Sequence, residues 1–94
     1  RELVAVGGLT RDPYTSDSTV GRIRHLYVRP ERRDAGLGRA LLIEIERRGS
    51  DAYRTFTLRT DTTAAARFYE AMGYRAVQES DTTHVRQIHS STRK

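Results

Sequence analysis

The chain has 94 residues, which predicts a single domain, and its formal net charge is +5. It contains no cysteine, which excludes a disulfide framework and thiolate chemistry and fits a reducing, cytoplasmic setting. No apolar run is long enough to span a membrane, so we expect no membrane partner.

Two runs of strand-forming residues near the start of the chain predict a β-hairpin. Residues 3–9 are apolar and partly β-branched, and residues 19–28 form a second run. The polar segment 12–18 between them contains Pro13 and is typical of a loop. We expect the two strands to pair with each other.

The second strand contains an irregular spacing of apolar residues. Ile23, Leu26 and Val28 are three and then two positions apart, so strict alternation cannot place all three on one face of a sheet. A β-bulge between Ile23 and Leu26 would restore the phase, whereas the alternative is that Leu26 simply faces outward. The glycine turn that follows favours the bulge.

Two glycines, Gly36 and Gly38, open the helix that follows this strand. The first turn of a helix has N–H groups without partners, and glycine lets a phosphate approach them closely. A P-loop is excluded, because Arg39 and Ala40 stand where it requires Lys and Ser or Thr. The dinucleotide fingerprint is weak, because Leu41 occupies the place of its third glycine.

Residues 36–48 show the periodicity of an amphipathic helix. Glu46 is expected on its outer surface, and Gly49 is a candidate C-cap. Residues 55–59 alternate in polarity and predict a strand that follows through a right-handed parallel crossover. Spacing of four residues predicts the buried face of the helix: Leu37, Leu41 and Ile45, with Ala40 beside them.

A second amphipathic helix follows and ends at Gly73, while residues 61–63 offer its N-cap. Segments 74–77 and 84–88 predict a final antiparallel pair, in which His84 is interpreted as incidental. One face of this second helix collects the apolar positions: Ala65, Phe68, Tyr69 and Met72.

Two motifs in the chain resemble those of one protein family. Residues 26–30 follow Leu-x-Val-x-Pro and residues 33–38 follow Arg-x-x-Gly-x-Gly, which resembles the signature of the GNAT superfamily of acyl-CoA-dependent N-acyltransferases. Residues 62–74 resemble a later motif of that family, an Asn-x-x-Ala-x-x-x-Tyr helix that runs into a Gly-aromatic turn. The resemblance implies an α/β fold whose mixed, mostly antiparallel sheet has a central splayed parallel pair and two helices.

The resemblance also implies the extent of the domain. Residues 1–89 would form a GNAT-like acetyl-CoA-binding domain, and residues 90–94 a disordered tail. The family fold starts with a strand, two helices and another strand, which precede the point where this chain begins. Those helices usually form one wall of the acceptor pocket, so we expect a homodimer or a partner segment to complete the fold.

Acetyl-CoA is the implied cosubstrate, with no metal. Its diphosphate would rest on backbone N–H groups, helped by nearby arginines, and its pantetheine arm would pair with the strand at residues 26–28. Thr62 stands where the family usually has Asn. The implied cofactor contacts are Leu26, Tyr27, Val28, Arg33, Asp34, Ala35, Gly36, Leu37, Gly38, Arg39, Ala40 and Thr62.

Tyr69 is the implied catalytic residue, which would give a proton to the departing thiolate. Without the resemblance, Tyr69 is a core aromatic, because it lies on the apolar face of its helix. The general base is not identifiable: Arg22 and Arg24 stand where many family members carry Glu, and His25 is a base by its chemistry alone. We hypothesise that Arg22 and Arg24 favour an acceptor with a carboxylate or phosphate.

The function implied is transfer of an acetyl group to a primary amine of a small molecule or polypeptide by direct attack. One alternative is a non-catalytic GNAT-like scaffold that binds CoA or a partner. Another is a basic nucleic-acid-binding module, but the chain has no recognition-helix motif and no aromatic RNA-binding signature. No His, Asp or Glu cluster has the spacing of metal ligands.

Overall fold

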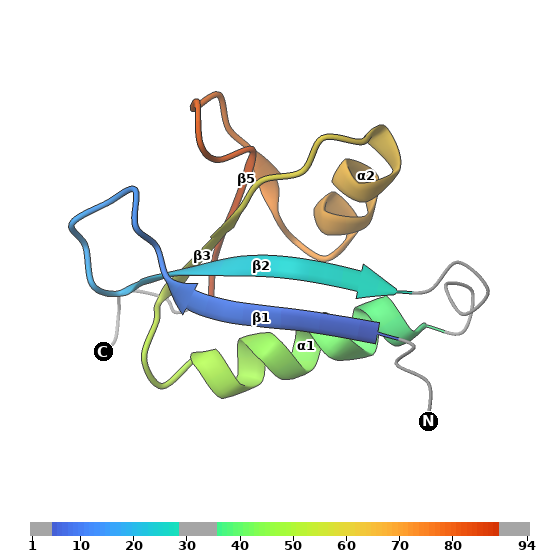
Figure 1. Cartoon of the computed structure of the whole chain (residues 1–94), viewed down its shortest axis with the longest axis horizontal. Coiled ribbons are helices and arrows are strands. Elements are labelled where there is room, and N and C mark those ends of the chain that lie inside the picture. The colour runs from blue at the N-terminus through green and yellow to red at the C-terminus, as the bar shows by residue number, and fades with distance from the viewer. Residues whose placement is uncertain (1–4, 29–35, 89–94) are drawn as a thin grey trace.

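A computed structural model describes residues 5–28 and 36–88 of the chain (Figure 1). Predictions that concern residues 29–35 and 89–94 therefore lie outside the described residues. None of the helices in the described part is long and apolar enough to cross a membrane. The elements follow in the order β1 Ala5–Arg11, β2 Val20–Val28, α1 Leu37–Gly49, β3 Thr55–Leu58, α2 Thr63–Ala71, β4 Arg75–Ala76 and β5 His84–Gln87.

The five strands form one mixed sheet in the order β1-β2-β3-β5-β4. β2 and β3 are parallel, and the other three neighbouring pairs are antiparallel. α1 connects the parallel pair, as the predicted crossover requires. The sheet therefore confirms the predicted fold class and both predicted antiparallel pairs.

A β-bulge interrupts the pairing of β1 with β2. Val6 faces Tyr27 and Gly8 faces Arg24, so β2 advances three residues while β1 advances two. The extra residue thus falls at His25 and Leu26 in β2, which confirms the bulge that the glycine turn favoured over an outward-facing Leu26.

β2 and β3 pair over only a short length. Their register runs from Val20 with Thr55 to Arg22 with Thr57, whereas β2 continues to Val28. Figure 1 shows β2 running on toward the start of α1, while the chain leaves β3 in the direction of α2. Beyond Arg22, the β3-facing edge of β2 therefore has no strand partner among the described residues, as expected for a splayed pair.

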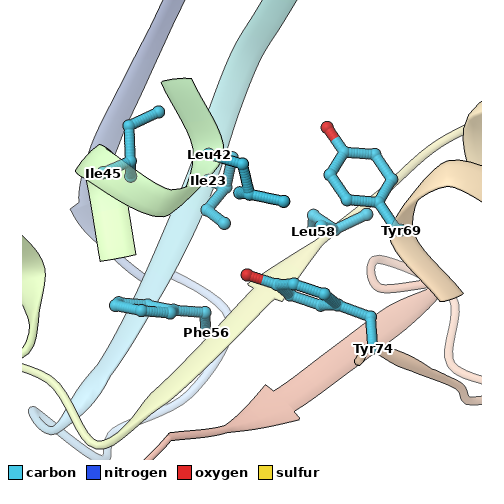
Figure 2. Packing of buried hydrophobic residues seen from close by; sticks show 7 residues of the cluster. All are labelled: Ile23, Leu42, Ile45, Phe56, Leu58, Tyr69 and Tyr74. Carbon is cyan, nitrogen blue, oxygen red and sulfur yellow. The ribbon is translucent and has the colours of Figure 1, made fainter. Parts of the chain in front are cut away.

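Both helices and three of the strands contribute to one hydrophobic core (Figure 2). Phe56 and Leu42 are fully buried at its centre. Tyr69 brings α2 into the same cluster, and Ala65, Phe68 and Met72 pack against it, as the periodicity of that helix predicted. The buried cluster consists of Ile23, Leu42, Ile45, Phe56, Leu58, Tyr69 and Tyr74.

The buried face of α1 agrees with the predicted one only in part, since Ile45 is buried and Leu41 packs against the core, but Ala40 is exposed. Successive steps of four residues turn by about 400°, so a strict four-residue series drifts around the helix. The series Leu42, Ile45, Glu46 and Gly49 instead alternates steps of three and one and stays on one side, and these are the buried residues. Glu46 is thus buried, and the prediction that it lies outside is wrong.

The ends of the helices follow local sequence signals in all but one place. Gly49 is the last residue of α1 and not its C-cap, which is Ser50. A Cβ at Gly49 would overlap Leu9 Cδ2 and lie 3.1 Å from Phe56 Cε1, so close packing explains this glycine. Thr62 is the N-cap of α2, as predicted, and its Oγ1 accepts a hydrogen bond from the next turn of the helix.

Candidate active site

The first turn of α1 begins at a left-handed glycine. Gly36 is the N-cap, with φ 76° and ψ 14°, and the first turn contains no acidic residue. The first helical hydrogen bond runs from Ala40 N–H to Gly36 O over 3.0 Å. The N–H groups of Leu37, Gly38 and Arg39 therefore precede it and have no acceptor within the helix. This turn suits an anion, although the predicted contact of Ala40 uses an N–H that the helix already employs.

The backbone of β2 supplies the second part of the site. Leu26 lies in the bulge, and Tyr27 follows it opposite Val6. Both residues belong to the part of β2 that has separated from β3. An extended ligand could pair with that free edge, which is the arrangement expected of Leu26, Tyr27 and Val28. The predicted contacts Arg33, Asp34 and Ala35 lie outside the described residues.

Tyr69 is buried in the core, with only 8% of its surface exposed. Its ring packs edge-to-face against Phe68 and Tyr74, at centroid distances of 5.1 and 5.6 Å. Its hydroxyl makes no hydrogen bond with any residue of the described chain, and in Figure 2 it points away from the backbone of α2. Burial raises the pKa of Tyr69 to about 12, so the phenol is protonated at neutral pH.

Thr62 begins the helix that carries Tyr69. Its Oγ1 accepts from Ala65 N–H at 3.1 Å, and the residue is exposed. Because that bond uses the oxygen as an acceptor, the hydroxyl hydrogen remains free to donate to a ligand. Threonine can thus both cap α2 and offer one hydrogen bond, where the asparagine of the family motif has a longer reach.

Arg22 is not available for an acceptor substrate. Only 5% of it is exposed, and its Nη1 donates to Thr82 Oγ1 over 3.1 Å. Its guanidinium lies 3.8 Å from Asp12 Oδ2 and 4.6 Å from the ring centroid of Tyr14. The side chain of Arg22 is thus engaged within the protein. Arg24 is half-buried, and its Nε donates to Thr10 Oγ1 over 3.0 Å. The anionic acceptor expected from these two arginines stays a prediction.

A polar cluster that the sequence did not reveal connects α1 to β5. The hydroxyl of Tyr74 donates to Glu46 Oε2 over 2.6 Å, and Arg86 Nη1 donates to Glu46 Oε1 over 2.7 Å. Burial and the Glu46 carboxylate raise the pKa of Tyr74 far above its usual value. The two bonds explain why Glu46 can occupy a core position of α1.

His84 belongs to a second unpredicted cluster, beside Tyr69. It is 4% exposed, and its Nε2 lies 3.0 Å from Glu70 Oε2. Its Nδ1 lies 3.0 Å from Thr83 Oγ1, and its ring centroid is 6.5 Å from that of Tyr69. His84 is therefore part of the packed structure between β5 and α2, which the sequence did not indicate. Within residues 5–28 and 36–88, no group of three or more His, Asp or Glu could hold a metal ion.

Comparison with known families agrees with this arrangement of sheet, glycine turn and second helix. The acetyltransferase (GNAT) domain family matches residues 1–76, so the chain belongs to the GNAT family. This result confirms the resemblance that the two sequence motifs predicted. No curated protein sequence matches the chain.

Solved structures of similar fold include several acetyltransferases. A putative acetyltransferase from Exiguobacterium sp. 255-15 is 32% identical, with a TM-score of 0.80 over 89% of this chain and 54% of that one. A GNAT-family acetyltransferase from Staphylococcus aureus Mu50 is 18% identical, with a TM-score of 0.79 over 93% of this chain and 61% of that one.

A larger enzyme contains a similar fold as a minor part of its chain. N-acetylglutamate synthase from Neisseria gonorrhoeae, solved with coenzyme A and N-acetylglutamate, is 16% identical, with a TM-score of 0.76. The match covers 93% of this chain and 23% of that one. The present chain thus spans little more than half the length of the first two structures and less of the third.

Proposed function

We propose that the protein is an N-acetyltransferase that moves an acetyl group from acetyl-CoA to a primary amine of a small molecule or polypeptide. The observation that carries this proposal is the glycine-started first turn of α1, which lacks acidic residues and follows the separated part of β2. Membership of the GNAT family supports the same reading.

The free backbone groups fit the shape and charge of the cosubstrate. The N–H groups of Leu37, Gly38 and Arg39 would hold the diphosphate, because they lack helical acceptors and lie at the positive end of the helix dipole. The open edge of β2 would pair with the amides of the pantetheine arm. Acetyl-CoA supplies a thioester, whose acyl carbon an amine can attack.

The backbone at the bulge would stabilise the charge that develops during transfer. An N–H of Leu26 or Tyr27 would donate to the thioester oxygen as its negative charge grows. The amine nitrogen forms its bond to the acyl carbon, the carbon–sulfur bond breaks, and the nitrogen gives up a proton to water or a base.

Tyr69 would meet the departing sulfur as a hydrogen-bond donor. A free thiol has a pKa of about 8.5, whereas the pKa of Tyr69 is about 12. Complete transfer from this phenol to a solvated thiolate is therefore uphill. Its contribution is a hydrogen bond to the sulfur as the carbon–sulfur bond breaks. The thiolate then takes its proton from solvent, and the phenol keeps its own.

Thiol release from acetyl-CoA over a panel of amines tests this function. Tyr69→Phe should lower kcat by about tenfold to a hundredfold with little change in KM. Tyr53→Phe is the matched control, because it removes the same hydroxyl from a half-buried tyrosine packed on Phe56 and should change neither constant. Binding of acetyl-CoA without turnover of any amine would instead indicate the non-catalytic scaffold.

A further inference from the structure

We propose that His84, held by Glu70, is a positioning residue that fixes α2 so that the hydroxyl of Tyr69 meets the departing sulfur. This inference rests on the proposed role of Tyr69. The reason to seek such a residue is that Tyr69 has no hydrogen bond of its own within the described chain. Its ring is oriented by packing alone, so the placement of α2 decides where its hydroxyl lies.

His84 reaches α2 from the neighbouring sheet. It begins β5 and pairs with Leu58 of β3 on one side and Ala76 of β4 on the other. Its Nε2 contacts the carboxylate of Glu70, which directly follows Tyr69 in α2. β5 is therefore hydrogen-bonded to α2 at Glu70, the residue next to Tyr69.

The other ring nitrogen of His84 is connected to the segment that leads into α2. Nδ1 contacts Thr83 Oγ1, and that oxygen accepts the N–H of Thr60 over 3.0 Å. Thr60 lies two residues before Thr62, the N-cap of α2. One imidazole thus connects the segment that leads into α2 with the turn that carries Tyr69.

The hydrogen bonds assign His84 a supporting rather than a chemical role. Nε2 faces the Glu70 carboxylate, which can only accept, so Nε2–H donates to it, and Nδ1 faces the hydroxyl of Thr83. Both ring nitrogens are then occupied, so neither remains for a substrate. The ring also lies against that of Tyr69, with an angle of 39° between the planes, and limits the tilt of the phenol.

A double-mutant cycle on turnover by the full chain tests this inference. His84→Ala should lower kcat about tenfold in the wild-type background, since small misplacements of a reacting group are costly, and leave the Kd for acetyl-CoA nearly unchanged by calorimetry. In a Tyr69→Phe background the same change should have little effect on kcat, because the hydroxyl to be placed is gone.

Three further variants separate positioning from loss of fold. Glu70→Gln keeps an acceptor for His84 Nε2–H and should retain most of kcat, whereas Glu70→Ala should repeat the loss seen in His84→Ala. Thr57→Val is the matched control, because it removes a buried bond to Asp12 elsewhere in the sheet and should leave kcat intact.

The outcomes distinguish this inference from the proposed function. If His84→Ala lowers kcat equally with and without the Tyr69 hydroxyl, His84 does not position that hydroxyl, and the proposal of acyl transfer still stands. The same conclusion follows if Glu70→Gln and Glu70→Ala lower kcat equally. If His84→Ala does not fold, the two variants of Glu70, which is exposed, test the inference without it. Absence of turnover in the wild-type protein would overturn both proposals.

Discussion

Replacing Glu46 by alanine should lower the free energy of unfolding by about 1–4 kcal/mol, mostly because it leaves the buried hydroxyl of Tyr74 without an acceptor. Tyr74 is 3% exposed and donates to Glu46 over 2.6 Å. Without that acceptor, the buried hydroxyl of Tyr74 has no hydrogen bond, which lowers the free energy of unfolding by about 1–3 kcal/mol. The side chain of Arg86 is 35% exposed, so water can replace its ion pair at a cost of less than about 1 kcal/mol.

Urea unfolding followed by circular dichroism measures this change. Glu44→Ala is the matched control on the same helix, because Glu44 pairs with Arg47 and Arg48 in solvent, and it should shift the urea midpoint much less than Glu46→Ala. In a Tyr74→Phe background, Glu46→Ala should cost about 1–2 kcal/mol less than in the wild type. Additive losses, or a loss no larger than that of the control, would refute the reasoning.

Further predictions concern two glycines and the buried phenol. Gly36→Ala should lower the free energy of unfolding by about 1 kcal/mol through its left-handed backbone alone, since no atom lies within 4 Å of the added Cβ; an unchanged urea midpoint would contradict this. Gly49→Ala should cost about 1–3 kcal/mol because the new methyl meets Leu9, offset by about 1 kcal/mol of better helix propensity; a more stable variant would show that Leu9 moves aside freely. The pKa of Tyr69 is raised from 10.0 to about 12 in the folded state, so its contribution to stability is complete below pH 10 and lost as the pH rises to 12, by up to about 3 kcal/mol. Tyr69→Phe should therefore show a shallower decline in stability over that interval, and parallel curves would count against the burial of the hydroxyl.

The order and type of the elements followed from local patterns in the sequence. Apolar residues predicted β2, and the glycine turn after it favoured the bulge over an outward-facing Leu26. The cap at Thr62 and the apolar face around Tyr69 predicted α2. These signals are enough to predict the elements because each depends on residues that are close together in the sequence. Gly36 and Gly38 also predict an anion site at the start of α1, and this stays a prediction.

The buried charges could not be predicted in this way. Arg22 and its partner Thr82 are 60 residues apart in sequence, and Glu46 and Arg86 are 40 apart. A charged residue enters a core only where distant chain segments supply its partners, and no local periodicity reports those segments. The same holds for His84, because its bond to Glu70 depends on β5 lying beside β3 in the sheet.

The pairing of β2 with β3 ends at Arg22, and the rest of that edge of β2 has no strand partner within residues 5–28 and 36–88. A ligand that paired with this edge would add backbone hydrogen bonds that the described residues do not make, so binding and folding would be thermodynamically linked. At a free concentration of a hundred times its dissociation constant, such a ligand would raise the free energy of unfolding by about 2.7 kcal/mol. The melting temperature would then report how much of the protein has ligand bound, even for compounds that are not substrates.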